Sequence, residues 1–128
     1  MNRLEGTIAF ARGSGAIRLV GLDTPSGRIH ALVLDTGSSD RAYAEGRKAA
    51  GLFKETSVVF HASPGSFLAG KVVSILPGEV LVALEVALDP TGTPLRAHLP
   101  VEELPGPLAV GDAVRLHVPA SAVALELR

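Results

Sequence analysis

The sequence predicts a mainly-β protein built from two tandem copies of one small barrel. Two short patterns each occur twice, about sixty residues apart. Leu4-x-Gly6-x-Ile8 returns as Leu68-x-Gly70-x-Val72, and Ala62-Ser63 returns as Ala120-Ser121. Runs of alternating apolar residues, separated by Gly and Pro turns, lie between these patterns. We therefore divide the chain into a first module, residues 1–63, and a second module, residues 64–128.

The first module is predicted to contain short strands and one helical connection. Strands are expected over residues 4–11, 17–22, 29–34 and 57–62, with Gly-rich turns between the first three. Residues 39–50 are rich in Ala, Glu, Arg and Lys, which favours a helix, and Gly51 is a suitable residue to end it.

The second module repeats this order with less helix. Strands are expected over residues 68–76, 80–88, 95–99 and 115–120, followed by a short tail strand at 123–125. Residues 100–104 have room for only one helical turn before Pro105. Five short strands with one helical linker per copy indicate an OB-like barrel. One extended β-sandwich has the same strand count and stays open as an alternative.

The composition indicates that the two modules pack on each other. A module of about sixty residues buries only about 60% of its unfolded surface and is marginal alone. Yet 47% of this 128-residue chain is hydrophobic and only 20% is charged. We expect contact between the modules and self-association with other copies of the chain. One compact monomeric core is the alternative.

Several classes of function find no support in the residues. The chain has no cysteine, and its four histidines show no metal-ligand spacing, so we expect no metal site. No nucleophile-elbow sequence is present, so we do not expect an enzyme. A net charge of −1, with only four Phe and one Tyr, argues against nucleic-acid binding.

The chain is expected to be cytoplasmic and to have no membrane contact. Its first residues lack the apolar core of a signal peptide, and Pro and Gly interrupt every apolar run before membrane-spanning length. Charge is divided unevenly: residues 1–63 carry eight Lys and Arg against six Asp and Glu, whereas residues 64–128 carry four against seven. The first module is therefore the better candidate for attracting an anion.

The order of these motifs resembles the molbindin family, the Mop or TOBE domains that bind molybdate and tungstate. The second copy carries most of the pattern: Leu68-x-Gly70-x-Val72, Ala97, Gly111-Asp112-x-Val114 and Ala120-Ser121. The first copy carries Asn2, Leu4-x-Gly6-x-Ile8, Ala31 and Ala62-Ser63. The resemblance covers nearly the whole chain. It implies two tandem OB-like modules, oxyanion sites between modules and assembly into a homo-oligomer, with a trimer favoured.

The resemblance also implies where an oxyanion would bind. The family places Lys directly before Ala-Ser, where this reading puts His61 in the first copy and Pro119 in the second. Asn2 matches a family Asn, and Arg3 lies one position from a family Arg. The predicted oxyanion-binding residues are therefore Asn2, Arg3, His61, Ala62, Ser63, Ala120 and Ser121. Because Pro119 is uncharged and lacks an N–H, we expect the two copies to bind unequally.

Two functions follow from this reading. The first is molybdate or tungstate binding for storage or homeostasis, with the oxyanion as the only bound ligand and no organic cofactor. The second is a structural or regulatory interaction module that has lost strong oxyanion binding. The tandem architecture favours the first, whereas the missing Lys and Arg favour the second.

Overall fold

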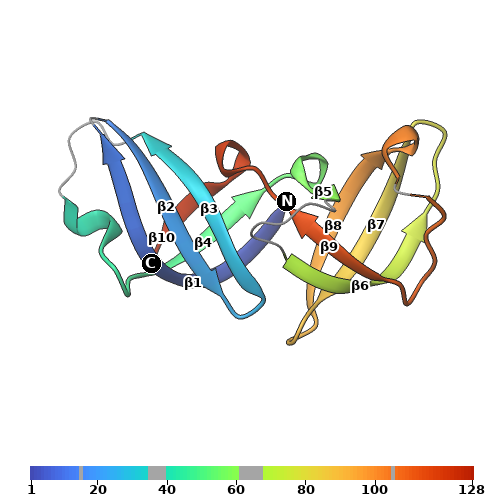
Figure 1. Cartoon of the computed structure of the whole chain (residues 1–128), viewed down its shortest axis with the longest axis horizontal. Coiled ribbons are helices and arrows are strands. Elements are labelled where there is room, and N and C mark those ends of the chain that lie inside the picture. Colours follow the sequence, from blue (N-terminus) through green and yellow to red (C-terminus); the bar gives the residue numbers. More distant parts are fainter. Residues whose placement is uncertain (15, 35–39, 61–67, 105) are drawn as a thin grey trace.

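The computed structural model describes all residues except 15, 35–39, 61–67 and 105. Its strands form two five-stranded antiparallel sheets, each curled into a small half-open barrel, and the two barrels lie side by side (Figure 1). This architecture confirms the predicted mainly-β fold with OB-like barrels. In the described part of the chain, no helix is long and apolar enough to cross a membrane.

The first sheet has the strand order β10-β4-β1-β2-β3. Its strands are β1 (Asn2–Ser14), β2 (Ile17–Thr24), β3 (Gly27–Leu34), β4 (Lys48–Phe53) and β10 (Ala124–Leu127). The second sheet has the order β5-β9-β6-β7-β8. Its strands are β5 (Val59–Phe60), β6 (Leu68–Leu76), β7 (Leu81–Leu88), β8 (Thr93–Pro100) and β9 (Ala113–His117).

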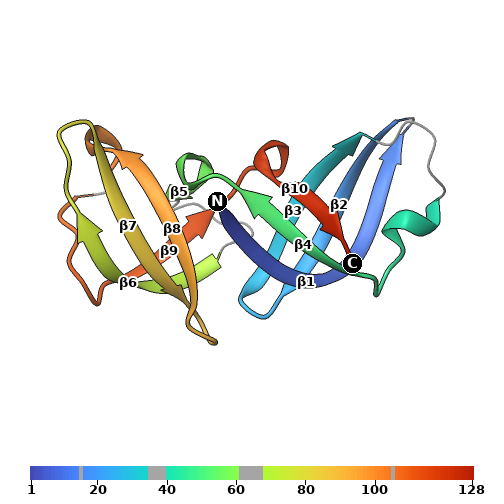
Figure 2. The same ribbon diagram turned by 180° about the vertical axis from the view of Figure 1, so that it is seen from behind.

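The two halves of the chain exchange their last strands. β10, from the C-terminal end, pairs with β4 in the first sheet, and β5, from the N-terminal half, pairs with β9 in the second. Figures 1 and 2 show the C-terminal strand lying within the N-terminal barrel. Buried side chains of both sheets belong to one continuous apolar cluster. The boundary at residues 63 and 64 lies outside the described residues, so the division into modules stays a prediction.

Short 3-10 helices connect the strands: η1 (Asp40–Tyr43), η2 (Glu55–Ser57), η3 (Val101–Glu103) and η4 (Ala120–Ala122). The helix expected over residues 39–50 is wrong beyond η1, because Lys48–Phe53 forms strand β4, which lies between β10 and β1 in the first sheet. Ala49 and Ala50 are fully buried there. Burial between two neighbouring strands overrides the helix propensity of these residues.

A steric requirement explains why glycine occurs at both Gly6 and Gly70. A Cβ on Gly6 would lie 2.3 Å from the carbonyl oxygen of Asp23, and a Cβ on Gly70 would lie 2.5 Å from that of Ala87. Each glycine therefore lets the next strand approach closely at the same point of its barrel. The pattern that indicated the duplication marks a shared packing requirement.

Candidate functional site

The 3-10 turns η2 and η4 occupy equivalent positions in the two halves. Each follows the strand that pairs with the first strand of its barrel, and each leads into an exchanged strand. The residues before the turns, Lys54 and Pro119, are both extended, with φ/ψ of −76°/154° and −59°/139°. The residues after them, Val58 and Val123, are also extended and are both buried. Lys54 is thus the structural counterpart of Pro119.

Strand register supports the same alignment. Leu4 pairs with Gly51 and Leu68 pairs with Leu116, which makes the ends of β4 and β9 equivalent. The segment equivalent to Ala120–Ala122 is therefore Glu55–Ser57, and not the segment containing Ala62 and Ser63. The sequence instead aligned Ala120-Ser121 with Ala62-Ser63, which lie outside the described residues.

In the structural alignment Lys54, and not His61, is the counterpart of Pro119. Sequence reasoning missed Lys54 and also Thr56, which is the counterpart of Ser121. A usable signal was present. Thr56 and Ser121 each come two positions before a buried valine. In the first half, Lys54 comes two positions before Thr56.

Residues of both turns line one cavity near the middle of the molecule. The cavity has a volume of about 370 Å³ and is mainly apolar. Its lining residues are Met1, Leu52, Phe53, Lys54, Ser57, Ala122 and Ala124. The strand exchange explains this arrangement, because Ala124 pairs directly with Leu52 and so brings η4 beside the end of β4. Among the described residues that line the cavity, Lys54 alone has a cationic side chain.

The residue after Lys54 is a glutamate, Glu55. Glu55 forms an ion pair with the N-terminal ammonium of Met1. That ammonium, together with the backbone N–H of Glu55 itself, lowers the pKa of the Glu55 carboxyl group below its usual value. The carboxylate therefore already uses donors that an oxyanion would need at this turn. Ala120, its counterpart in η4, carries no charge.

The structure gives Asn2 a structural partner. Asn2 begins β1, and its side chain is only 6% exposed. Its amide Nδ2 donates to the carbonyl oxygen of Arg96 at 2.7 Å, and its Oδ1 accepts from the backbone N–H of Arg96 at 2.8 Å. Asn2 thus joins the first barrel to strand β8 of the second, and two of its hydrogen-bonding atoms are engaged.

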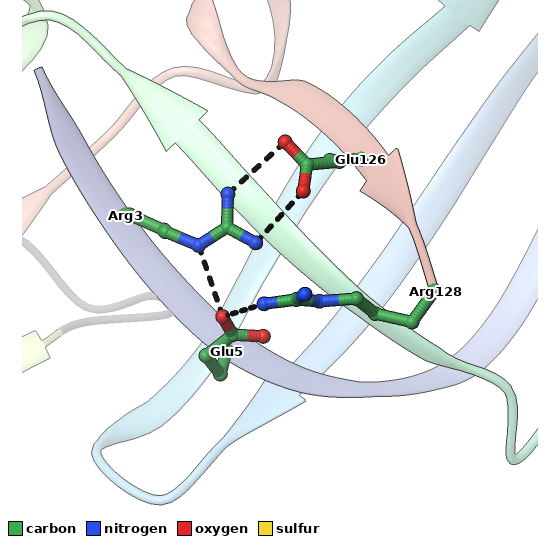
Figure 3. A network of polar contacts seen from close by, with 4 residues as sticks. All are labelled: Arg3, Glu5, Glu126 and Arg128. Carbon is green, nitrogen blue, oxygen red and sulfur yellow. Dashed lines mark hydrogen bonds and ion pairs between the residues drawn. The ribbon is translucent and has the colours of Figure 1, made fainter.

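Arg3 belongs to a four-residue network of ion pairs on the outer face of the first sheet (Figure 3). Its Nη1 and Nη2 atoms lie 3.0 and 2.8 Å from the carboxylate oxygens of Glu126, and its Nε lies 2.9 Å from Glu5. Arg128 also pairs with Glu5. Hydrogen bonds from Arg3 to Glu126 and Glu5 raise the pKa of Arg3. The guanidinium is therefore held by two carboxylates.

The remaining predicted residues divide into two groups. Ala120 and Ser121 form the start of η4, directly before β10. His61, Ala62 and Ser63 lie outside the described residues. Strand pairing brings the described members close together, since Arg3 pairs with Leu52 and Leu52 pairs with Ala124. Their role in binding an oxyanion stays a prediction.

The fold, in contrast to the sequence, has a close match among solved structures. No protein-family model matches the chain, and a search of curated proteins gives no match either. Among solved structures, the chain is similar to ModG, described as a cytoplasmic molybdate-binding protein and crystallised with molybdate bound. The match has a TM-score of 0.85 and 20% sequence identity, and it covers 99% of this chain and 96% of that one. This chain therefore has the fold of the molybdate-binding protein ModG over nearly its whole length.

Proposed function

We propose that this protein binds molybdate or tungstate in the cytoplasm, for storage or homeostasis of the oxyanion. The observation that carries the proposal is the fold similarity to ModG, which extends over both barrels and leaves almost no part of either chain unmatched. Fold similarity alone does not transfer a function. The turn residues add support for the proposal here, because the fold places them at corresponding points of the two halves.

The chemistry of a tetrahedral dianion fits the residue types at these turns. Such an anion is bound by backbone N–H groups, short hydroxyl side chains and one or two cations. The first turn offers Lys54 and the hydroxyl of Thr56, whereas the second offers Ser121 beside the uncharged Ala120. Asn2, Arg3, His61, Ala62 and Ser63 stay candidates from the sequence. At the first turn the lysine is followed by the charged Glu55, and at the second turn the uncharged Ala120 has no lysine before it. We therefore expect two unequal sites.

Isothermal titration of the purified protein tests this proposal. Molybdate, tungstate and sulfate are titrated separately at low ionic strength, because surface charges are screened least there. We expect saturable heat with molybdate and tungstate and much less with sulfate. No heat and no thermal stabilisation with any of the three would refute oxyanion binding, since a ligand of the folded state must stabilise it.

A second candidate function is a structural or regulatory interaction module without strong oxyanion binding. Two residues favour it: Glu55 places a carboxylate at the first turn, and Pro119 removes an N–H donor at the second. An inert titration, combined with an intact fold, would support this function over the first.

We propose that the chain is not an enzyme, that it binds neither nucleic acid nor membranes, and that it forms a homo-oligomer, with a trimer suggested by the molbindin resemblance. Within the described residues, no group of three His, Asp or Glu side chains is placed to hold a metal ion. We also propose that the oxyanion itself is the bound ligand, with no organic cofactor.

A further inference from the structure

An exposed apolar surface covers the outer face of the first barrel at one end, and we name it patch A. It consists of Ile17 and Leu19 on β2 and Leu32 and Leu34 on β3. Ile17 pairs with Leu34, and Leu19 pairs with Leu32, so the four side chains point to the same side of the sheet. Leu34 is 74% exposed and Ile17 is 56% exposed. Clustered leucines and isoleucines at this exposure are typical of an interaction surface.

A second exposed apolar surface, patch B, lies at the equivalent end of the second barrel. It consists of Leu76, Val80, Leu81 and Val101, all of them exposed. Leu81 is the structural counterpart of Ile17, because both begin the second strand of their barrel in the same register. Beside Leu76 the outer face is hollowed by a groove of about 240 Å³, which is also lined by Glu85, Arg96 and His98.

The two patches differ in the charges around them. Arg12 pairs with Leu19 on the neighbouring strand and so borders patch A, where its guanidinium lies 4.4 Å from the centre of the Phe10 ring. Patch B is bordered by exposed carboxylates, which belong to Glu79, Glu102 and Glu103. Patch A is thus apolar with a cationic edge, and patch B is apolar with an anionic edge.

The patches cannot meet within one molecule. They lie at opposite ends of its long axis, next to the β1–β2 turn and the β6–β7 turn (Figures 1 and 2). We propose that patch A of one chain docks on patch B of a second copy of the chain. The inference specifies the self-association included in the proposed function, and it does not depend on oxyanion binding.

Charge complementarity decides the pairing in favour of unlike patches. Contact of patch A with another patch A would bring two Arg12 guanidinium groups together, and contact of patch B with patch B would oppose clusters of carboxylates. Like charges facing each other at an interface are unfavourable, whereas opposite charges favour docking and set its orientation. An interface between unlike patches leaves one free patch at each end, so the assembly either closes as a ring or continues to grow as a filament.

Sedimentation velocity of two variants and their mixture tests the proposal without any oxyanion present. Leu34→Glu disrupts patch A and Leu76→Glu disrupts patch B; Leu76 is 68% exposed, so neither change touches the core. We expect the wild type to sediment as an oligomer of the 13.2 kDa chain and each variant to sediment as a monomer. An equimolar mixture should form dimers and nothing larger, since only one intact patch of each kind remains for pairing.

Other outcomes would overturn the proposal. A monomeric wild type, a variant that keeps the wild-type mass, or a mixture that stays monomeric would each contradict docking of patch A on patch B. Val110→Glu is the matched control, because Val110 is 64% exposed but lies outside both patches, and it should keep the wild-type mass. Ile17→Glu, a second change in patch A, should act like Leu34→Glu, and circular dichroism checks that each variant is folded.

Because no molybdate is added, the sedimentation result and the titration result are independent. Wild-type association with an inert titration would refute the oxyanion function and keep the interface. A monomeric wild type that binds molybdate would refute the interface and keep the oxyanion function.

Discussion

The side chain of Asn2 and the backbone of Arg96 are joined by two hydrogen bonds, of 2.7 and 2.8 Å, in opposite directions. The two residues are 94 positions apart and belong to different barrels. Asn2 therefore acts like one more residue of a β-ladder, with its amide in place of a peptide group. It extends the contact between the halves beyond the exchanged strands β5 and β10.

Replacing Asn2 by alanine should destabilise the protein by about 1–3 kcal/mol, because it leaves the backbone N–H and C=O of Arg96 without this partner. Urea unfolding measures the loss. Arg96→Ala is the matched control, since it removes the exposed side chain but keeps the backbone that Asn2 contacts, and it should change stability little. Equal losses in both variants would mean that the two hydrogen bonds are not the cause.

Replacing Gly70 by alanine should cost about 1–3 kcal/mol, because the new Cβ would overlap the carbonyl oxygen of Ala87 and the strands would have to separate. Gly6→Ala should have a similar effect in the other barrel, where the obstacle is the carbonyl oxygen of Asp23. Thermal unfolding of both variants measures the effect. Ala69→Ser, at an exposed neighbouring position, should be close to neutral; unchanged stability of Gly70→Ala would contradict the steric explanation.

The ion-pair network of Arg3, Glu5, Glu126 and Arg128 should make stability depend on pH on the acid side. Hydrogen bonds from Arg3 lower the pKa of Glu126, and those from Arg128 and Arg3 lower the pKa of Glu5. A lowered folded-state pKa means that the contribution is fully present above the ordinary value of 4.5 and is lost as pH falls through the folded pKa.

Glu126→Gln should therefore lower the Tm slightly at neutral pH and low salt, and the difference from the wild type should vanish in acid and at high salt. The effect is small because exposed ion pairs contribute little. Glu45→Gln, at an exposed position outside the network, is the control. A difference that persists unchanged at low pH would show that the carboxylate charge of Glu126 is not responsible.

Lys54→Ala should abolish or strongly weaken oxyanion binding at the first turn, because it removes the cationic side chain that lines the central cavity. Lys48→Ala, which removes an exposed lysine of β4 outside that cavity, is the matched control and should bind as the wild type does. Titration calorimetry with molybdate compares the three proteins. Unchanged binding by Lys54→Ala would place the site elsewhere, with the residues 61–63 as the next candidates.

Glu55→Ala should strengthen oxyanion binding at the same turn, since it removes the carboxylate that competes for the N-terminal ammonium and the backbone N–H. The same titration measures this change. Weaker binding in Glu55→Ala would mean that the carboxylate positions the donors and does not compete with the ligand.

Local patterns predicted much of this fold. The expected strand over residues 68–76 agrees with β6, and the tail strand expected at 123–125 agrees in place with β10. Strand β4 was missed, because its alanines suit a helix in isolation. Ala50 shows what the sequence could not reveal: it pairs with Glu5 on one neighbouring strand and with Glu126 on the other, so it lies between residues of the ion-pair network.

The sequence by itself determined the β class and predicted two repeated modules, because both depend on neighbouring residues or on a repeated pattern. Only the tertiary structure decided which turns correspond, which strands are exchanged and what Asn2 and Arg3 contact. Those relations join residues up to 123 positions apart. Strand register and the shared apolar core set them, and neither leaves a signal within a short stretch of sequence.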